Sequence, residues 1–398
     1  VASGRHLEVV DFINYRKLTS SLRYHFATGN WSLQQNVNTG VVMLMARVCR
    51  AATLASGRRV NTQCNKDGKA TECRNLHSSD PGMTCLHDTP EGQSCGIVEN
   101  LASFTHISMG VPTSAFVDTI REGIEGIENP QVPPPPGWRP LFINGVLIGT
   151  VRREHLQPVT DRIRRMRLLH GLPTDMGVVL TKQEEIHITS GVGQCLRPLY
   201  RVDRLHLLSG VIAECVDRPE ELWTCTLMAG IIEYLGKAEE GSGCIVASSA
   251  KTVRAGYHTH IEIDPISVLG VLSAMQPFPE HNQSPRNIYQ TNMGKQCISL
   301  PVHQYEWRFD RHLHVMNYPQ HALVTTQIET VQNGDSYPHG MNAVVAIMCY
   351  GGFNQEDSII FNRTAVELGM ARITYYRTYR DDISRVGAHD NERYEIPD

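Results

Sequence analysis

The spacing of apolar and polar residues predicts helices in two parts of the chain. Residues 37–54 carry apolar side chains near helical spacing, and residues 160–170 form a second amphipathic run that ends before Gly171. The polar face of the second run is basic and consists of Arg162, Arg164, Arg165 and Arg167. We expect these arginines to form a solvated helix face, which is the more frequent fate of such charges than phosphate contact.

Strands are predicted where β-branched and aromatic residues lie between turn residues. Residues 140–150 predict a hairpin, because Asn144-Gly145 at their centre favours the tight turn between two antiparallel strands. Residues 186–188 and 199–202 are predicted to form a strand pair that closes the same small domain. The proline run at 132–138 predicts a stiff linker and a boundary.

Residues 342–362 carry the most informative pattern. An apolar, β-branched run is followed by Gly351 and Gly352, then by the adjacent carboxylates Glu356 and Asp357, and then by a second apolar run. We interpret this order as strand, turn, acidic pair and strand. Rigidly held carboxylates suit a hard cation such as Mg²⁺, although adjacent acids at a turn more often belong to a solvated loop.

A second candidate metal site lies at residues 257–264. His258, His260, Glu262 and Asp264 occupy every second position, so a strand would place them on one face. The alternation supports an alternative function, a stand-alone metalloenzyme that uses His258, His260 and Glu262. A strand with one buried face explains the same alternation equally well.

Composition limits the functional class only weakly. A chain of 398 residues predicts about two to four domains, and a hydrophobic content of 41% is enough to form buried cores. The formal net charge of −4 does not indicate a general nucleic-acid binder, so such contacts must come from local basic patches. One basic patch consists of Arg58, Arg59, Lys66, Lys69 and Arg74.

Cysteine usage indicates a reducing compartment. The chain has eleven cysteines and no CxxC pair. Four cysteines cluster loosely, but their spacing is not that of a zinc ribbon; they are Cys64, Cys73, Cys85 and Cys95.

No apolar run has the length of a membrane span, and no signal peptide is visible. Because the chain starts at Val1 and not at Met, we expect it to be cut from a longer chain.

Four sequence blocks occur in an order that is typical of one protein family. They are YHFATGNWS at 24–32, HDTPEGQSCGIVENL at 87–101, PFPEHNQSPRNIYQTNMGKQ at 277–296 and YGGFNQEDSIIFN at 350–362. Together they resemble the second-largest (β-type) subunit of multisubunit DNA-dependent RNA polymerases, in its eukaryotic, archaeal or large-DNA-virus form. Four long matches in order are far more specific than any short motif.

The resemblance implies an α+β multidomain fold and a central fragment of such a subunit. Residues 1–20 would end a lobe-like domain, and residues 21–104 would form a fork-like region of helices and strands. Residues 105–205 and 206–250 would be two small α/β modules of an external domain. Residues 251–398 would begin a β-rich, barrel-like hybrid-binding region.

The resemblance also implies an activity, the template-directed synthesis of RNA by nucleotidyl transfer from nucleoside triphosphates. Glu356 and Asp357 would then lie beside the second catalytic Mg²⁺, which is shared with the nucleotide, while the largest subunit holds the first ion. No NADFDGD-like string occurs in this chain, so we expect activity only in an assembled complex. A zinc site is expected outside these residues.

Other site residues follow from the same resemblance. Arg286 would point at the phosphates of the nucleotide with Tyr289 close by, whereas spacing alone places Arg286 in a loop before a helix. Lys295 and Gln296 would face the RNA end or the RNA–DNA hybrid. The basic patch at 58–74 would contact nucleic acid where the downstream duplex opens.

The implied partners are the largest subunit, the assembly subunits, template DNA, the RNA–DNA hybrid and nucleoside triphosphates, with no membrane. The implied location is the nucleus, or the cytoplasm or virion for an archaeal or viral protein. A non-catalytic paralogue is a third possibility, but it would carry damaged site residues. Glu356, Asp357, Arg286 and Tyr289 are all present, which argues against a paralogue.

Overall fold

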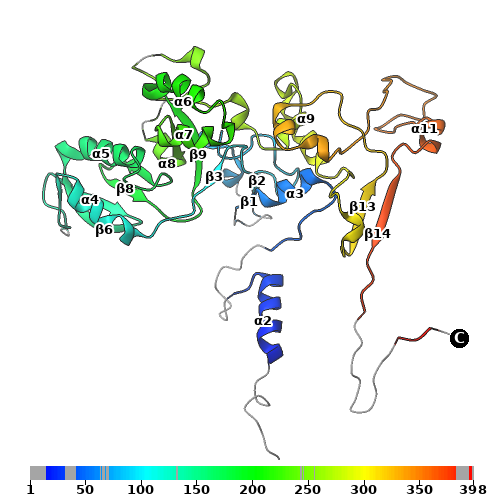
Figure 1. Ribbon diagram of the computed structural model, residues 1–398, viewed down its shortest axis with the longest axis horizontal. Helices are drawn as coiled ribbons and strands as arrows, with labels where there is room; N and C mark the ends of the chain where they lie inside the picture. Colours follow the sequence, from blue (N-terminus) through cyan, green and yellow to red (C-terminus); the bar gives the residue numbers. More distant parts are fainter. Residues whose placement is uncertain are drawn as a thin grey trace, which may run out of the picture. The chain divides into compact units, whose positions relative to one another are not determined.

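A computed structural model describes most of the chain, which divides into two compact units at Ala46/Arg47. The described residues are 15–31, 42–62, 64, 68, 71–130, 133–242, 244, 246–254, 256–381 and 394–396. In the first unit, α2 (Tyr15–Thr28) is followed by Trp31, whose ring stacks on His25 with ring centroids 5.3 Å apart. The helices and strands described below belong to the second unit (Figure 1).

The first helix of the second unit is shorter than the hydrophobic pattern predicts. Helix α3 covers Arg50–Gly57, and residues 42–49 are not helical. The cause is local, because the Sγ of Cys49 accepts the backbone N–H of Ala52 at 3.2 Å and so caps the helix. The prediction of a helix over 37–54 is therefore wrong for 42–49, and residues 37–41 lie outside the described part. Strands β1 (Arg59–Asn61) and β2 (Val98–Asn100) follow as an antiparallel pair.

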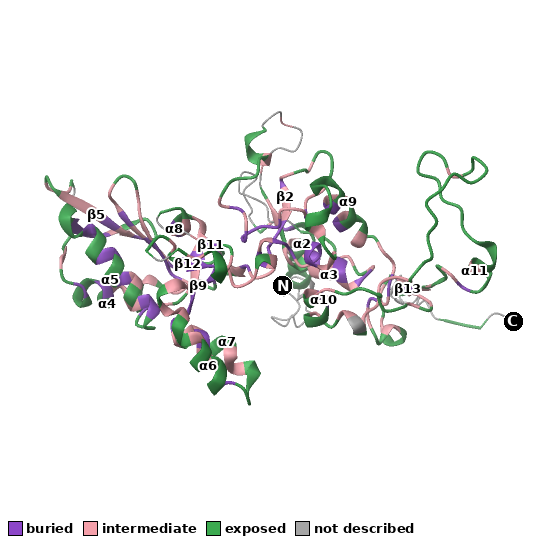
Figure 2. Ribbon diagram, turned by 90° about the horizontal axis from the view of Figure 1, so that it is seen from above, coloured by how far each residue is buried: buried purple, intermediate pink, exposed green. Residues whose placement is uncertain are grey.

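A five-stranded sheet with two helices forms the main hydrophobic core. Its strand order is β4-β6-β5-β8-β7, and its strands are β4 (Ile127–Glu128), β5 (Trp138–Ile143), β6 (Val146–Arg152), β7 (Gly177–Leu180) and β8 (Ile186–Thr189). Helices α4 (Val117–Gly123) and α5 (Leu156–Leu168) bury apolar side chains in the same cluster, which includes Ile120, Leu141 and Ile163. Figure 2 shows the buried residues of these elements in purple.

The predicted hairpin is confirmed. Strands β5 and β6 pair antiparallel around Asn144 and Gly145, whose φ angles are 49° and 81°. Both values lie in the left-handed region that this turn requires and that Asn-Gly tolerates. The boundary predicted at the proline run is wrong, because residues 133–137 connect β4 to β5, and both strands pair with β6 in one sheet.

A second sheet has the order β10-β9-β12-β11, with β3 also paired to β9. Its strands are β3 (His106–Ile107), β9 (Cys195–Arg201), β10 (Ile232–Gly236), β11 (Val246–Ala247) and β12 (His260–Ile261). The helices between them are α6 (Leu208–Glu214), α7 (Leu222–Met228) and α8 (Lys237–Gly241). The predicted pairing of 186–188 with 199–202 is wrong, since β8 and β9 belong to different sheets.

From residue 272 onward the chain is mostly loop. The elements are α9 (Ser284–Gly294), β13 (His312–Met316), α10 (Gln327–Val331), α11 (Arg363–Glu367) and β14 (Ile373–Arg377). Strands β13 and β14 form an antiparallel pair. The α+β class is confirmed, but within the described residues this region contains no closed barrel and is not β-rich.

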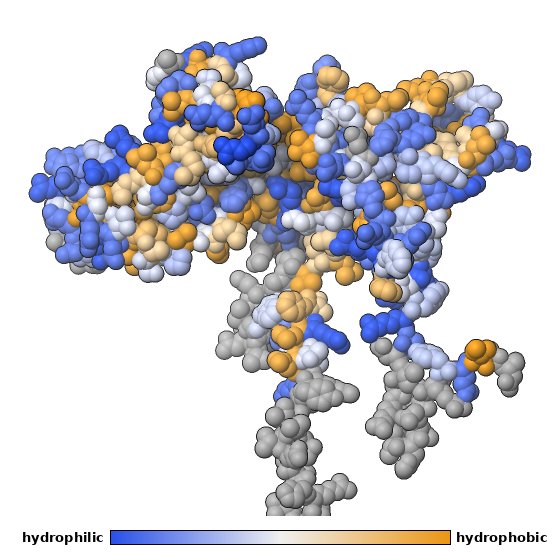
Figure 3. Space-filling model, viewed as in Figure 1, coloured by the Kyte–Doolittle hydropathy of each residue, from blue (hydrophilic) through white to orange (hydrophobic). Residues whose placement is uncertain are grey.

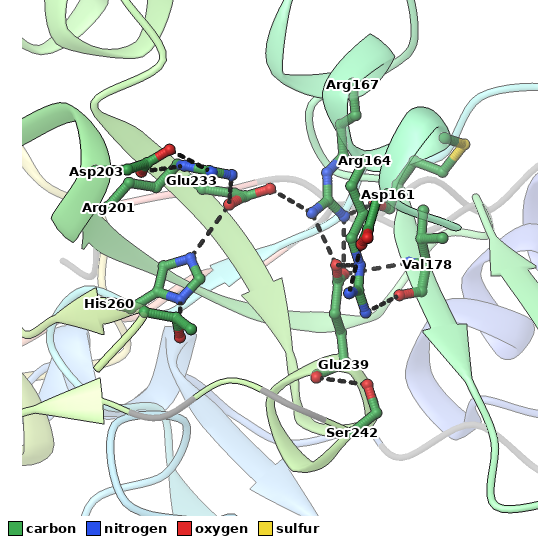
Figure 4. Close-up of polar contacts among 12 residues, drawn as sticks. Asp161, Arg164, Arg167, Val178, Arg201, Asp203, Glu233, Glu239, Ser242 and His260 are labelled. Carbon is green, nitrogen blue, oxygen red and sulfur yellow. Dashed lines mark hydrogen bonds and ion pairs between the residues drawn. The ribbon is translucent and has the colours of Figure 1, made fainter. Parts of the chain in front are cut away.

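A buried ion network ties α5 to the second sheet (Figure 4). The side chain of Arg167 is 2% exposed and donates to Glu233 at 2.5 Å and to Glu239 at 2.8 Å. Arg201 and His260 also contact Glu233, at 3.1 and 3.2 Å. The prediction that all four arginines of this helix are solvated is therefore wrong for Arg167, and also for Arg164, whose side chain is 23% exposed and lies 3.2 Å from Glu239.

The network keeps Glu233 ionised. Burial alone would raise the pKa of Glu233, but the hydrogen bond with His260 and the charges of Arg167 and Arg201 outweigh burial. The pKa of Glu233 therefore lies well below its ordinary value. A charged carboxylate in this position is stable only while its cationic partners stay in place.

Candidate functional site

The acidic pair lies in a turn and not between strands. Among the described residues of 342–362 no strand is present, so the predicted order of strand, turn and strand is wrong. Asn354 shapes the turn, because its Nδ2 donates to the Met348 carbonyl at 2.6 Å and its Oδ1 accepts the Tyr350 N–H at 3.0 Å. Glu356 and Asp357 have φ angles of 51° and 68°, in the left-handed region.

The two carboxylates are available to an external cation. Both residues are exposed, and neither makes a hydrogen bond or an ion pair within the part of the chain that the structure describes. Mg²⁺ binds through one or two carboxylates, phosphate oxygens and its own waters, so a pair of unengaged carboxylates suits it. No cluster of three or more His, Cys, Asp or Glu side chains that could hold a metal occurs among the described residues, so any ion here needs further ligands.

The apolar residues around the pair are also exposed. Ile347 is 99% exposed and Phe353 is 82% exposed, and Val344 and Ile359 are exposed as well. Figure 2 draws the loop before α11 in green, and Figure 3 shows orange, apolar side chains over the same part of the face it displays. Exposed apolar residues in such number are typical of a contact surface.

Arg286 and Tyr289 lie on one helix and interact. Pro285 occupies the first turn of α9, and the Arg286 guanidinium lies 5.2 Å from the ring centroid of Tyr289. Arg286 is exposed and lines a cavity of about 450 Å³ together with Asn282, Gln290 and His339. Within the described residues, no hydrogen bond, ion pair or ring contact joins Arg286 or Tyr289 to Glu356 or Asp357.

Lys295 and Gln296 follow α9 and have different environments. The Nζ of Lys295 forms an ion pair with Asp88, whose side chain is 2% exposed. Gln296 is exposed. The Lys295–Asp88 contact links the block at 277–296 to the block at 87–101. Asp88 is a residue that sequence reasoning missed, although it belongs to the HDTPEGQ block that carried the family resemblance.

The basic patch at 58–74 is only partly described. Lys66 and Lys69 lie outside the described residues. Arg58 is half-buried and donates to the carbonyl of Ala102 at 2.5 Å, and burial lowers the pKa of its guanidinium. Arg74 donates to the carbonyl of Gln93 at 2.5 Å. Arg59, at the start of β1, is exposed.

The three candidate ligands of the alternative metalloenzyme do not converge. His258 accepts the backbone N–H of Arg254 at 2.9 Å, and His260 is buried against Glu233. Glu262 forms an ion pair with Arg197 and accepts a hydrogen bond from Ser267. Strand β12 covers only two residues, so the predicted four-residue face is absent. The metalloenzyme alternative is not supported.

Comparison with known proteins identifies the class to which these features belong. Residues 43–107 match the family model described as RNA polymerase Rpb2, domain 3, and residues 272–397 match that described as RNA polymerase Rpb2, domain 6. The first match includes Asp88 and the second includes α9 and the acidic pair. These two matches identify the class as that of RNA polymerase subunits, and both matched segments contain residues of the candidate site.

Individual relatives define the family more closely. The chain is 35% identical over its whole length to DNA-directed RNA polymerase II subunit 2 of Arabidopsis thaliana and 34% identical to subunit RPB2 of Schizosaccharomyces pombe. It is 32% identical, over 99% of its length, to subunit Rpo2 of Sulfolobus acidocaldarius. The chain spans only 35%, 37% and 36% of these three relatives. It belongs to the family of second-largest subunits of multisubunit DNA-directed RNA polymerases.

No helix among the described residues has the length and apolar character needed to cross a membrane.

Proposed function

We propose that this chain contributes to template-directed RNA synthesis by nucleotidyl transfer, as part of an RNA polymerase assembled with a largest subunit. The observation that carries the proposal is that 99–100% of this chain matches part of the polymerase subunits of a plant, a fungus and an archaeon. The proposed partners are the largest subunit, assembly subunits, template DNA, the RNA–DNA hybrid and nucleoside triphosphates. The proposed location is the nucleus, or the cytoplasm for an archaeal protein.

Glu356 and Asp357 are proposed to help hold the second Mg²⁺ of the reaction, through water. When bound, this ion neutralises charge on the triphosphate of the incoming nucleotide. The contribution of the chain is a pair of exposed carboxylates that follow a turn in which Asn354 bonds to Met348 and Tyr350. The remaining oxygens would come from the nucleotide and from the largest subunit.

Arg286 is proposed to bind the nucleotide phosphates. Its planar guanidinium can donate two parallel hydrogen bonds to phosphate oxygens. The Tyr289 ring under the guanidinium supports the side chain from the same helix. The basic patch is proposed to lie near nucleic acid; its residues are Arg58, Arg59, Lys66, Lys69 and Arg74. Gln296 is proposed to face the RNA–DNA hybrid. Lys295 is proposed to face the RNA end or the hybrid, and its ion pair with Asp88 would hold the side chain in place.

The proposal is tested first by reconstitution. We expect the purified chain to extend no RNA on a template by itself, because its sequence contains no NADFDGD-like string for the first ion. A polymerase assembled from the complete set of subunits, with this sequence in its second-largest subunit, is expected to extend a primer on a scaffold. Radiolabelled primer extension with and without the largest subunit measures this. RNA synthesis by the chain alone, or none by the assembly, contradicts the proposal.

A substitution tests the role of Arg286. In the assembled enzyme, Arg286→Ala is expected to raise the nucleotide concentration for half-maximal addition about 10-fold, because a charge-assisted hydrogen bond to phosphate is lost. Single-nucleotide addition at varied triphosphate concentration measures the change. Arg311→Ala, an exposed arginine outside the cavity, is the matched control. An unchanged nucleotide dependence in Arg286→Ala would rule out the phosphate contact.

A further inference from the structure

Two thiols meet at the junction of α3 and α9. Cys49 is the N-cap residue of α3, and Cys297 lies just beyond the end of α9. The Sγ of Cys297 donates to the Gly294 carbonyl oxygen at 3.1 Å, and the Sγ of Cys49 lies 3.5 Å from the same oxygen. Two sulfurs within hydrogen-bond distance of one carbonyl oxygen are neighbours, and rotation of their side chains can bring them together to form a bond.

The surroundings of Cys49 favour its thiolate. The Ala52 N–H donates to the Cys49 Sγ at the N-terminus of α3, where the helix dipole stabilises negative charge. The neighbouring Cys297 thiol lowers the pKa of Cys49 to about 7, although burial opposes the shift. Cys49 is fully buried, whereas Cys297 is half-buried. A small oxidant must therefore pass along the half-buried Cys297 to reach the Cys49 sulfur.

We propose that Cys49 and Cys297 form a reversible disulfide in response to hydroperoxides. The Cys49 thiolate attacks one oxygen of the hydroperoxide, so that an S–O bond forms, the O–O bond breaks, and the leaving oxygen takes up a proton. The Cys297 sulfur then attacks the Cys49 sulfur, so that an S–S bond forms and water leaves with the Cys297 proton. Two electrons pass from the sulfurs to the hydroperoxide.

The disulfide would join segments that match separate family domains. Cys49 lies in the segment at 43–107 and Cys297 in the segment at 272–397. Ala51 and Gly294, next to the thiols, line the same cavity as Arg286. The bond would therefore fix one wall of this cavity. The inference rests on the thiol geometry alone and stands even if the proposed function fails.

Another thiol pair provides an internal comparison. The Cys225 thiol raises the pKa of its neighbour Cys215, and both residues belong to the α6–α7 hairpin. A disulfide between them closes a short loop, whereas one between Cys49 and Cys297 closes a loop that spans more than half of the chain. The two disulfides therefore differ in their effect on gel mobility, because a large covalent loop keeps a denatured chain compact.

The test uses the full chain, reduced and then exposed to hydrogen peroxide. After alkylation we expect a faster band on a non-reducing denaturing gel, which dithiothreitol removes, and a Cys49–Cys297 linked peptide by mass spectrometry. Cys49→Ser and Cys297→Ser should abolish both signals, whereas Cys349→Ser, at an exposed cysteine outside the pair, should retain them. Serine at position 49 can still cap α3, so this variant keeps its fold.

Two results would overturn the proposal. One is oxidation of other cysteines with no faster band and no linked peptide. The other is equal formation of the linked peptide when the chain is oxidised in guanidinium chloride. Pairing of Cys49 with Cys297 would then come from random encounters in the unfolded chain and not from the folded geometry. Circular dichroism of each serine variant is compared with that of the parent chain. An unchanged spectrum shows that the loss of the faster band and of the linked peptide reflects the missing thiol and not a loss of fold.

Discussion

Replacing Asp357 with alanine is expected to slow nucleotide addition by about 10²-fold in a polymerase whose second-largest subunit carries this sequence, as is typical when one preorganised electrostatic group is lost at a reacting centre. Asp357 is exposed and makes no hydrogen bond or ion pair among the described residues, so its removal costs the fold little. The loss should therefore appear in the maximal rate and in a higher Mg²⁺ requirement. Rapid-quench measurement of single-nucleotide addition across a Mg²⁺ titration separates the two.

The matched control for this substitution is Glu367→Ala. Glu367 is an exposed acid in α11, where it pairs with Arg363 at 2.8 Å. We expect its removal to leave the rate unchanged, because the pair is a solvated i,i+4 contact. Co-purification of the subunits tests assembly in both variants. Normal elongation by Asp357→Ala, or failure of that variant to assemble, contradicts the role proposed for the acidic pair.

The largest expected effect on stability comes from Arg167→Met. This change leaves the buried carboxylates of Glu233 and Glu239 without their shared partner and should lower the free energy of unfolding by about 3–5 kcal/mol. Arg201, Arg164 and His260 remain near the acids and can compensate only in part. Urea unfolding followed by far-UV circular dichroism measures the change in midpoint.

Arg165→Met is the control, because Arg165 lies on the same helix and is exposed. We expect a change within about 0.5 kcal/mol there, as for most surface substitutions. Equal midpoints for the two variants would show that the network adds nothing to stability. The comparison holds helix propensity nearly constant, because both substitutions replace arginine by methionine in one helix.

The features predicted well from sequence are those that local chemistry determines. The hairpin at Asn144-Gly145 needs only two residues that accept positive φ, and both are adjacent in the chain. The helix that contains Ile163 follows from apolar spacing within a few turns. The family resemblance also rests on contiguous blocks, which explains why the acidic pair and α9 were found without a structure.

The features predicted badly depend on partners far away in the sequence. Arg167 reads as one more charge on a basic helix, because Glu233 and Glu239 lie 66 and 72 residues further along the chain. Lys295 likewise meets Asp88 from a separate block, 207 residues away. Neither contact leaves a local signal, since ion pairing between distant segments is a property of the fold and not of residue spacing.

The apolar runs beside Glu356 and Asp357 show a different limit. Their β-branched residues predict strands, yet β propensity expresses how well a residue fits a paired and half-buried surface. Ile347 and Ile359 are exposed and have no neighbouring strand among the described residues. A sequence pattern can show that a segment is suited to a sheet, but not that a sheet is available to receive it.

The central position of β9 has a consequence for how the chain folds and how it can be divided. On one edge β9 pairs with β10, and on the other it pairs with β3 and β12, which come from before and after it in the sequence. A truncation that cuts into residues 106–261 from either end would remove a strand that pairs with β9. Because these pairings close long loops, the sheet has a high contact order, and its assembly is expected to be a slow step in folding.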